Sequence, residues 1–380
     1  MPTGDRGPLA LLLTGGGARG AYQVGVLRGL AALHPDLEIP ILAGVSAGGI
    51  NVACLAASRS GLRGGIETLN ELWCSISPDD VFRADPWSLF RGALRWMARL
   101  GSGGSHIVPK TRGLVDTSPL WGLLRRVLDA DINDEIPFIE ENLESGGLLA
   151  AGLATIDWST GRTIFWVQGR GIESWRRPQR SGVQTRLSVD HVMASAALPL
   201  LFPAVKLAGS WHGDGGVRLT TPLAPAIHLG ARRIIAVSTR YDRSAAEAAT
   251  PQVTGYPPPA QIGGILLHSI FLDQLDHDAY QLERTNRLLR HLDDGHREGL
   301  RYLDLLVLRP SVDLGKLAAE YEAKMPRGIR FLTRGLGTHE TRDADFLSLL
   351  MFQEDYVRRV IAIGEEDAHR QREAVLALVE

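Results

Sequence analysis

The chain has 380 residues, of which 44% are hydrophobic and 22% charged, and its formal net charge is −2. These values are ordinary for a globular protein with a sizeable core. The near-neutral charge excludes nucleic acid as a bulk electrostatic partner. The two cysteines, Cys54 and Cys74, show neither metal-ligand spacing nor a disulfide framework. We therefore expect both to be buried, reduced thiols.

Near the N-terminus, residues 8–13 form an apolar run that is too short for a signal peptide or a membrane span. No other stretch approaches 18 uninterrupted apolar residues. We expect a cytoplasmic protein, and peripheral contact with the inner membrane face stays open.

The first 56 residues predict alternating strands and helices. Residues 9–13 read as a buried parallel strand, 15–20 as a turn and 21–33 as a helix. A second strand at 39–43 is followed by a segment of small residues with a helical pattern. This β-α-β-α order predicts an α/β fold with a mainly parallel sheet and helices on both faces.

The rest of the chain continues the mixed pattern. Residues 61–128 are helical with interruptions, and 101–105 read as a flexible loop. We expect a hairpin from 148–156 and 163–167, strands at 205–207, 211–212, 233–238 and 303–308, and helices at 223–229, 265–292, 314–324, 327–336, 345–350 and 353–378. Residues 245–259 read as a linker or surface loop.

The most informative motif is Gly44-Val45-Ser46-Ala47-Gly48, between the second strand and the following helix. A sharp strand–turn–helix connection of this kind exposes a serine as a nucleophile. The flanking glycines permit the tight turn, and the positive end of the following helix faces the hydroxyl. Ser46 is therefore a candidate nucleophile, with Gly44 and Gly48 forming its elbow.

A glycine-rich turn, residues 15–20 (Gly-Gly-Gly-Ala-Arg-Gly), follows the first strand. It satisfies the dinucleotide-binding pattern, but that reading needs an acidic residue at the end of the next strand, and Glu38 instead precedes that strand. The favoured interpretation is an oxyanion hole made by the backbone N–H groups of Gly16 and Gly17.

A third motif, Asp214-Gly215-Gly216, lies on a loop between apolar segments. Taken alone, it is more typical of a turn than of a catalytic base. Together with the glycine-rich turn, the Ser46 elbow and the proline-containing stretch 194–203, it resembles the patatin-like phospholipase family in motif order and spacing. The resemblance covers about residues 9–229.

This resemblance implies a three-layer α/β/α fold and a Ser–Asp dyad that hydrolyses lipid acyl esters without a metal or cofactor. Ser46 would be the nucleophile and Asp214 its base, and Gly16 and Gly17 would hold the oxyanion. Gly15, Arg19 and Gly20 would support the oxyanion loop, as Gly215 and Gly216 would support the aspartate. We expect the family domain at residues 8–230 and an α-rich extension with one or two added strands at 231–380.

Two alternatives concern the histidines. A triad would need one of His212, His228, His268, His277 or His339 as an intermediary base. The cluster of His268, His277, Asp273, Asp276 and Asp278 suggests metal ligation, but its spacing favours a solvated helix face, and we expect no metal.

Residues 86–100 predict a helix with a cationic stripe opposite an apolar one. The arginines Arg91, Arg95 and Arg99 recur every four residues, and Trp87, Phe90 and Met97 belong to the apolar side. Contact with an anionic membrane surface competes here with ordinary packing of a surface helix.

We expect a serine hydrolase that cleaves fatty-acyl ester bonds of phospholipids or lysophospholipids through an acylated Ser46. An acyltransferase that uses the same acyl-enzyme and a non-catalytic lipid-binding protein remain alternatives. The sequence leaves the oligomeric state open.

Overall fold

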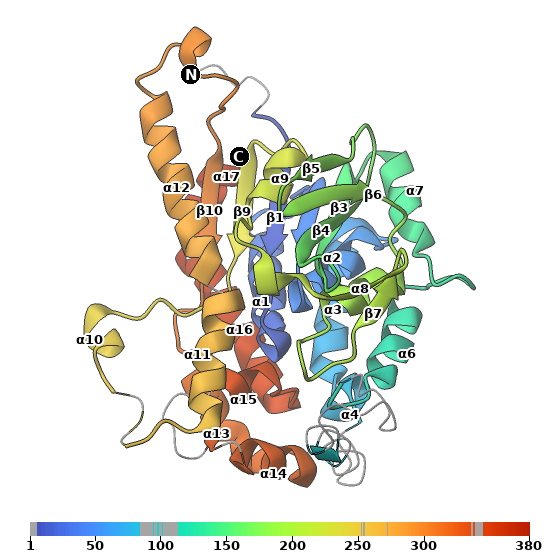
Figure 1. Cartoon of the computed structure of the whole chain (residues 1–380). Coiled ribbons are helices and arrows are strands. Elements are labelled where there is room, and N and C mark those ends of the chain that lie inside the picture. The colour runs from blue at the N-terminus through green and yellow to red at the C-terminus, as the bar shows by residue number, and fades with distance from the viewer. Residues whose placement is uncertain are drawn as a thin grey trace.

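The computed structural model describes residues 6–83, 94, 97–98, 101, 113–251, 253, 255–271, 273–335, 337–338 and 345–380. A mixed sheet runs through this part of the chain (Figure 1), with the strand order β10-β9-β1-β2-β3-β4-β6-β5. These strands are β1 (Leu9–Leu13), β2 (Ile41–Gly44), β3 (Ala150–Asp157), β4 (Arg162–Gly169), β5 (Trp175–Arg177), β6 (Arg180–Gln184), β9 (Arg233–Val237) and β10 (Asp304–Leu308).

In the part of the sheet from β10 through β9, β1 and β2 to β3, each pair of adjacent strands is parallel. Strands β3 and β4 form an antiparallel hairpin. Strand β8 (Ser210–Asp214) pairs antiparallel with β3 and with the short β7 (Val205–Leu207). The expected α/β fold with a mainly parallel central sheet is therefore confirmed.

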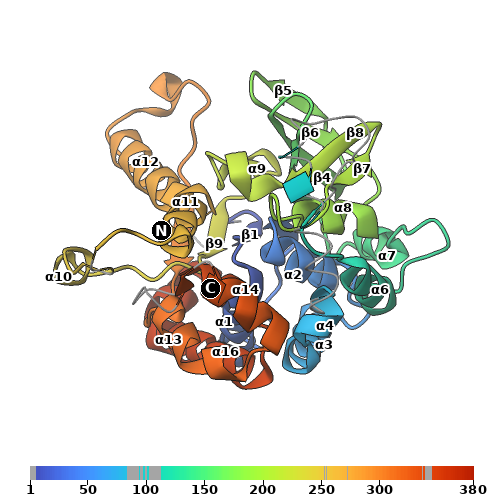
Figure 2. The same ribbon diagram turned by 60° about the horizontal axis from the view of Figure 1, so that its bottom comes forward.

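Helices cover both faces of the sheet, as Figure 2 shows. Successive side chains of a strand point to opposite faces, so Leu11 and Leu13 of β1 pack in one core cluster and Ala10 and Leu12 in another. The first cluster includes residues of α1 (Gly20–Leu33), α2 (Ala47–Ala56), α3 (Gly61–Ser75) and α16 (Glu354–Arg370). The second includes residues of α9 (Ala224–His228) and α12 (Asp273–Leu289).

Helices α1 and α16 pack unusually closely. A Cβ added to Gly25 would lie 1.9 Å from the carbonyl oxygen of Ile361, and one added to Gly364 would lie 2.3 Å from that of Tyr22. Glycine on both helices thus lets their backbones touch. Together with β9 and β10, which extend the sheet beside β1, this contact joins the C-terminal region to the first βα unit.

Most of the predicted strands are present within two residues of their expected bounds, including β1, β3, β4, β9 and β10. Some helix predictions are wrong. The expected linker at 245–259 contains α10 (Ala245–Ala248), which Ser244 caps through its side chain. The expected helix 265–292 is two helices, α11 (Pro259–Phe271) and α12, and the expected helix 353–378 ends at Arg370 and resumes as α17 (Arg372–Val379).

Several elements had no sequence prediction. They are β5, β6, α7 (Pro137–Ser145) and α8 (Val189–Ser195). Strands β5 and β6 are short and arginine-containing, and they exist because β6 pairs with β4. Tertiary pairing of this kind overrides local propensity. The remaining helices are α4 (Pro78–Val81), α6 (Ser118–Val127), α13 (Leu314–Tyr321), α14 (Arg327–Gly335) and α15 (Asp345–Leu349).

Candidate active site

Ser46 lies between the end of β2 and the start of α2. Residues other than glycine rarely adopt its backbone conformation. Its φ is 59° and its ψ −130°, and holding a residue with a Cβ in such a sparsely populated region costs about 1–3 kcal/mol. The N–H groups of Gly49 and Ile50 donate to the Ser46 carbonyl at 2.9 and 3.2 Å. The positive end of α2 therefore begins directly at the serine.

The elbow needs glycine on both sides of Ser46 because other backbone segments approach it closely. A Cβ at Gly48 would lie 2.3 Å from the carbonyl oxygen of Leu13 in β1. A Cβ at Gly44 would lie 2.5 Å from the carbonyl oxygen of Gly48 itself. The G-x-S-x-G spacing thus allows the turn to sit against the neighbouring strand.

The glycine-rich turn after β1 faces the same region. Gly16 and Gly17 have φ values of 154° and 54°, and Gly17 borders the same pocket as Ser46. Within the described residues, neither backbone N–H donates to another protein group. Both N–H groups are therefore available as donors, and Gly17 is the one that borders the pocket beside Ser46.

A buried network of side chains holds this turn. The Thr239 hydroxyl donates to the carbonyl oxygen of Gly15 at 2.7 Å, and the Gln23 amide donates to that of Thr14 at 2.7 Å. The amide of Asn51, on α2, donates to Gln23 at 2.9 Å. The same network thus links the glycine turn to the helix that carries the Ser46 elbow.

Arg19 points away from the glycine turn, toward α15. Its Nε donates to the Ser348 hydroxyl at 2.6 Å, and its guanidinium pairs with the Asp345 carboxylate. Burial lowers the pKa of Arg19, but the charge and hydrogen bond of Asp345, together with Tyr356 and Asp313, offset this and leave that pKa raised. The pair ties the loop to the C-terminal region.

Asp214 ends β8, directly opposite Thr155 in β3. Its backbone N–H donates to the Ala197 carbonyl at 3.0 Å, and the N–H of Gly216 donates to its Oδ1 at 2.9 Å. The side chain is fully buried. Burial raises the pKa of Asp214 to about 7, and hydrogen bonds from the Ser46 hydroxyl and Gly216 oppose that rise.

Ser46 and Asp214, 168 positions apart in the chain, thus lie close enough for the Ser46 hydroxyl to lower the pKa of Asp214. The Oδ2 atom of Asp214 is nevertheless buried without a hydrogen bond of ordinary geometry to any described residue. The two groups are therefore close but not aligned for an ordinary hydrogen bond. This arrangement places a carboxyl group with a pKa near neutrality beside the hydroxyl of a serine whose backbone is strained.

Ser195, at the end of α8, contacts the Ser46 elbow although no sequence motif points to it. Its hydroxyl accepts the Ser46 backbone N–H at 3.1 Å and donates to the Ala154 carbonyl of β3 at 2.8 Å. It thereby joins the elbow to the strand that pairs with Asp214. The only sequence signal was a polar residue among the alanines of the 194–203 stretch.

No described histidine is placed as a triad member. His212 is buried, but its Nδ1 lies 3.0 Å from the Thr155 hydroxyl and its ring packs on Trp166. Burial lowers the pKa of His212. His228 stacks on Trp175, and His277 is exposed. His339 lies outside the described residues, as does the side chain of His268.

The pocket that contains Ser46 is almost entirely apolar. The space between its walls is about 570 Å³ when the part that opens to solvent is counted. No charged side chain lines it within the described residues, and its walls include Trp73, Ile76, Leu124, Phe202 and Phe352. Such walls suit a hydrocarbon chain and not a charged headgroup.

A sequence profile described as "Patatin-like phospholipase" matches residues 11–227, more than half of the chain. The chain belongs to the patatin-like phospholipase family. A lipid substrate is thereby implied. No curated protein matches the chain.

Solved structures with a similar fold include VipD from Legionella pneumophila, at 12% identity and a TM-score of 0.37, covering 98% of this chain and 67% of that chain. Human GIVD cytosolic phospholipase A2 in complex with methyl gamma-linolenyl fluorophosphonate matches at 14% identity and a TM-score of 0.43, covering 98% and 58%. This patatin-like chain therefore spans about three fifths of the human chain's length.

Most of the arginine-striped helix expected at 86–100 lies outside the described residues. This holds for Trp87, Phe90, Arg91, Arg95 and Arg99. Met97 is described and is exposed. Elsewhere, no described helix of this patatin-like protein is long and apolar enough to cross a membrane. The part of the chain that the structure covers also contains no group of three His, Cys, Asp or Glu side chains suited to a metal ion.

The two cysteines differ in their surroundings. Cys54 is buried, and burial raises the pKa of its thiol to about 12, whereas Cys74 is half-buried. Both are free thiols. The expectation of burial is therefore confirmed for Cys54 only.

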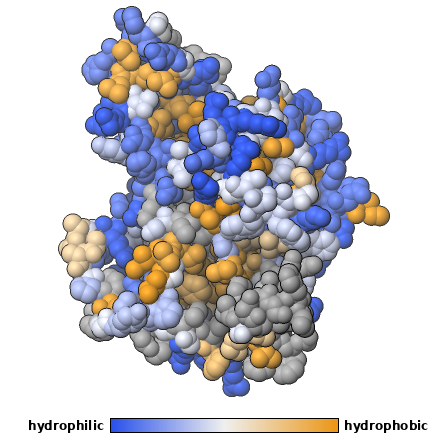
Figure 3. All heavy atoms as spheres, in the orientation of Figure 1, coloured by the Kyte–Doolittle hydropathy of each residue, from blue (hydrophilic) through white to orange (hydrophobic). Residues whose placement is uncertain are grey.

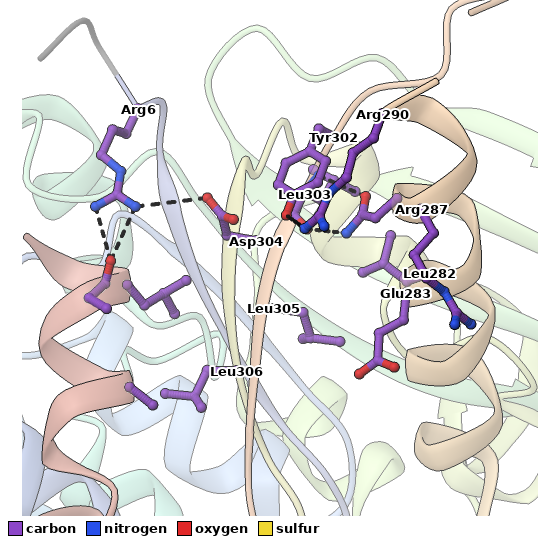
Figure 4. Close-up of a pocket in the computed structure, with 14 residues that line it drawn as sticks. Arg6, Leu282, Glu283, Arg287, Arg290, Tyr302, Leu303, Asp304, Leu305 and Leu306 are labelled. Carbon is purple, nitrogen blue, oxygen red and sulfur yellow. Dashed lines mark hydrogen bonds and ion pairs between the residues drawn. The ribbon is translucent and has the colours of Figure 1, made fainter. Parts of the chain in front are cut away.

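A second cleft lies at the opposite end of the sheet, where β1 and β10 begin (Figure 4). Arg6 donates to the carbonyl oxygen of Ala377 at 3.1 Å and lies 4.0 Å from Asp304. Arg290 donates to the Tyr302 hydroxyl at 3.2 Å. These contacts hold α12 and α17 beside β10.

Proposed function

We propose that this patatin-like protein is a serine hydrolase that cleaves fatty-acyl ester bonds of phospholipids or lysophospholipids. The observation that carries the proposal is that Ser46, which lines an apolar pocket, lies beside the buried carboxyl group of Asp214. The pocket suits an acyl chain, and the pair suits acyl transfer. The headgroup would stay outside the pocket, because no described charged side chain lines it.

In the acylation step, the Ser46 oxygen attacks the ester carbonyl carbon while Asp214 accepts the hydroxyl proton. The carbonyl oxygen becomes negative and takes hydrogen bonds from the N–H groups of Gly16 and Gly17. The bond between carbon and the alkoxy oxygen then breaks. The proton held by Asp214 passes to the departing alcohol, which leaves Ser46 acylated.

In the deacylation step, water attacks the acyl carbon and gives one proton to the Asp214 carboxylate. The same pair of N–H groups stabilises the second oxyanion. Collapse of this intermediate returns the proton to Ser46 and releases a fatty acid. A pKa of about 7 for Asp214 suits both the basic and the acidic half of this cycle near neutral pH.

The decisive experiment incubates the wild type, Ser46→Ala and Asp214→Asn with a mixed lipid panel and identifies the products by mass spectrometry. We expect free fatty acid and the matching deacylated lipid from the wild type alone. A fluorophosphonate probe should label the wild type and not Ser46→Ala. Residual hydrolysis by Ser46→Ala equal to that of the wild type would contradict the proposal.

The same assay separates the alternatives. An added alcohol that receives most of the acyl groups would identify an acyltransferase using the same acyl-Ser46. Lipid binding without any product or labelling would identify a non-catalytic lipid-binding protein. Histidine-to-alanine changes at His212 and His277 should leave the product yield unchanged, because neither side chain acts on Asp214.

A further inference from the structure

Helix α11 is an uncharged helix on the surface beside the candidate active site. Its 13 residues, Pro259–Phe271, include no Asp, Glu, Lys or Arg. A Cβ added to Gly264 would lie 3.6 Å from the Cβ of Asp345, so one side of the helix rests on α15. The helix also contacts the short 3₁₀ turn Gly215–Arg218.

The two elements that α11 packs against, α15 and the turn Gly215–Arg218, both border the candidate active site. The turn Gly215–Arg218 follows Asp214 directly. Helix α15 contributes Leu349, which lines the apolar pocket together with Ser46. Any surface that α11 presents to the outside is therefore adjacent to the candidate catalytic residues.

The outward side of α11 is hydrophobic. The exposed fractions of Ile262, Ile265 and Leu266 are 44%, 55% and 57%, and their i, i+3, i+4 spacing puts them on one helix face. Tyr256, in the loop before the helix, is 89% exposed. Figure 3 shows hydrophobic residues gathered over this helix. Single exposed apolar residues are common, but a grouped face beside a site indicates a binding surface.

We propose that this α11 face, Ile262, Ile265 and Leu266 with Tyr256, docks the protein on a zwitterionic phospholipid surface. The inference rests on the proposed function, because a lipid hydrolase must reach substrate held in an aggregate. An apolar helix face with a neighbouring aromatic residue is suited to the boundary between headgroups and acyl chains. The absence of charge from α11 assigns zwitterionic lipid, since attraction to anionic lipid requires basic residues.

Binding can be measured without turnover in the Ser46→Ala background. Vesicles of dioleoylphosphatidylcholine are mixed with the protein and separated by flotation. We expect Ile265→Glu combined with Leu266→Glu to reduce the bound fraction by about tenfold or more, because charged side chains resist entry into the interface. The matched control combines Leu288→Glu and Leu300→Glu, at positions that are 60% and 55% exposed, and should bind like its parent.

Equal binding by the α11 variant and the control would overturn the proposal. Binding that requires anionic lipid would overturn the assignment of zwitterionic lipid. Light scattering tests the competing occupant, a second copy of the chain. A parent dimer that the α11 substitutions convert to monomer would assign the face to self-association instead.

Activity separates failure of this inference from failure of the proposed function. On a soluble short-chain ester, the α11 variant with Ser46 intact should match the wild type, whereas hydrolysis of vesicle lipid should fall with vesicle binding. An inactive wild type that still binds vesicles through α11 would overturn only the proposed function. An active wild type whose vesicle hydrolysis is unaffected by the α11 substitutions would overturn only the docking surface.

Discussion

The hydroxyl of Ser195 accepts the backbone N–H of Ser46 at 3.1 Å and donates its own proton to the Ala154 carbonyl at 2.8 Å. One fully buried side chain thus connects the strained elbow to β3, the strand opposite Asp214. Since the Ser46 conformation is unfavourable in itself, such contacts must hold it in place.

Ser195→Ala should lower kcat on a soluble ester by about tenfold and leave KM nearly unchanged. The substitution leaves the buried Ser46 N–H without its partner, which costs about 1–3 kcal/mol and loosens the elbow. The rate of fluorophosphonate labelling should fall in parallel. Ser181→Ala, at a buried serine in β6, is the control and should keep both rates. Unchanged labelling of Ser195→Ala would contradict a positioning role.

The pH profile should report the carboxyl group of Asp214. Burial raises the pKa of Asp214 to about 7, and only the ionised carboxylate can accept the proton of Ser46. The value of kcat/KM on a soluble ester should therefore rise about tenfold per pH unit below 7 and level off above it. A flat profile between pH 5 and pH 9 would exclude Asp214 as the base.

Asp214→Asn should abolish hydrolysis and yet stabilise the fold at alkaline pH. The folded-state pKa of Asp214 lies above that of a free aspartate, so the unfolded state binds fewer protons between about pH 4 and pH 7. Stability contributed by this group is therefore lost as the pH rises through that window, by roughly 4 kcal/mol at most. Urea unfolding should show little gain for Asp214→Asn near pH 4 and the largest gain above pH 7. A gain independent of pH would contradict this linkage.

The strain at Ser46 predicts a difference between two inactive variants. Ser46→Gly should have a free energy of unfolding about 1 kcal/mol higher than Ser46→Ala, because glycine adopts a φ of 59° without steric cost. Denaturant titration of both variants at one pH measures the difference. The reverse order of stability would show that the elbow is not strained.

The ion pair between Arg19 and Asp345 should matter more for stability than a surface pair. Arg19→Met leaves Asp345 without its main partner and should lower the free energy of unfolding by about 3 kcal/mol. The control is Arg28→Met, which breaks a half-exposed pair with Glu365 at 3.3 Å and should cost under about 1 kcal/mol. An equal loss of unfolding free energy in the two variants would contradict the larger contribution that we expect from the buried pair.

The sequence was sufficient to predict the βα units because short motifs of neighbouring residues specify them. The apolar run of β1, the glycines of the following turn and the small residues around Ser46 each reflect the geometry of a few consecutive residues. Prediction from local sequence is less successful where pairing between strands decides the structure. Strands β5 and β6 carry no strong pattern and form only because β4 lies beside them.

The sequence by itself determined the family, the order of the first strands and helices, and the candidate residues Ser46, Asp214, Gly16 and Gly17, because these depend on short motifs. Tertiary structure decided that Ser195 holds the elbow, that Arg19 pairs with Asp345 and that burial brings the pKa of Asp214 to about 7. Each of these properties depends on partners or on exclusion of water by segments distant in the chain. A linear motif specifies which groups are present, whereas only packing specifies what surrounds them.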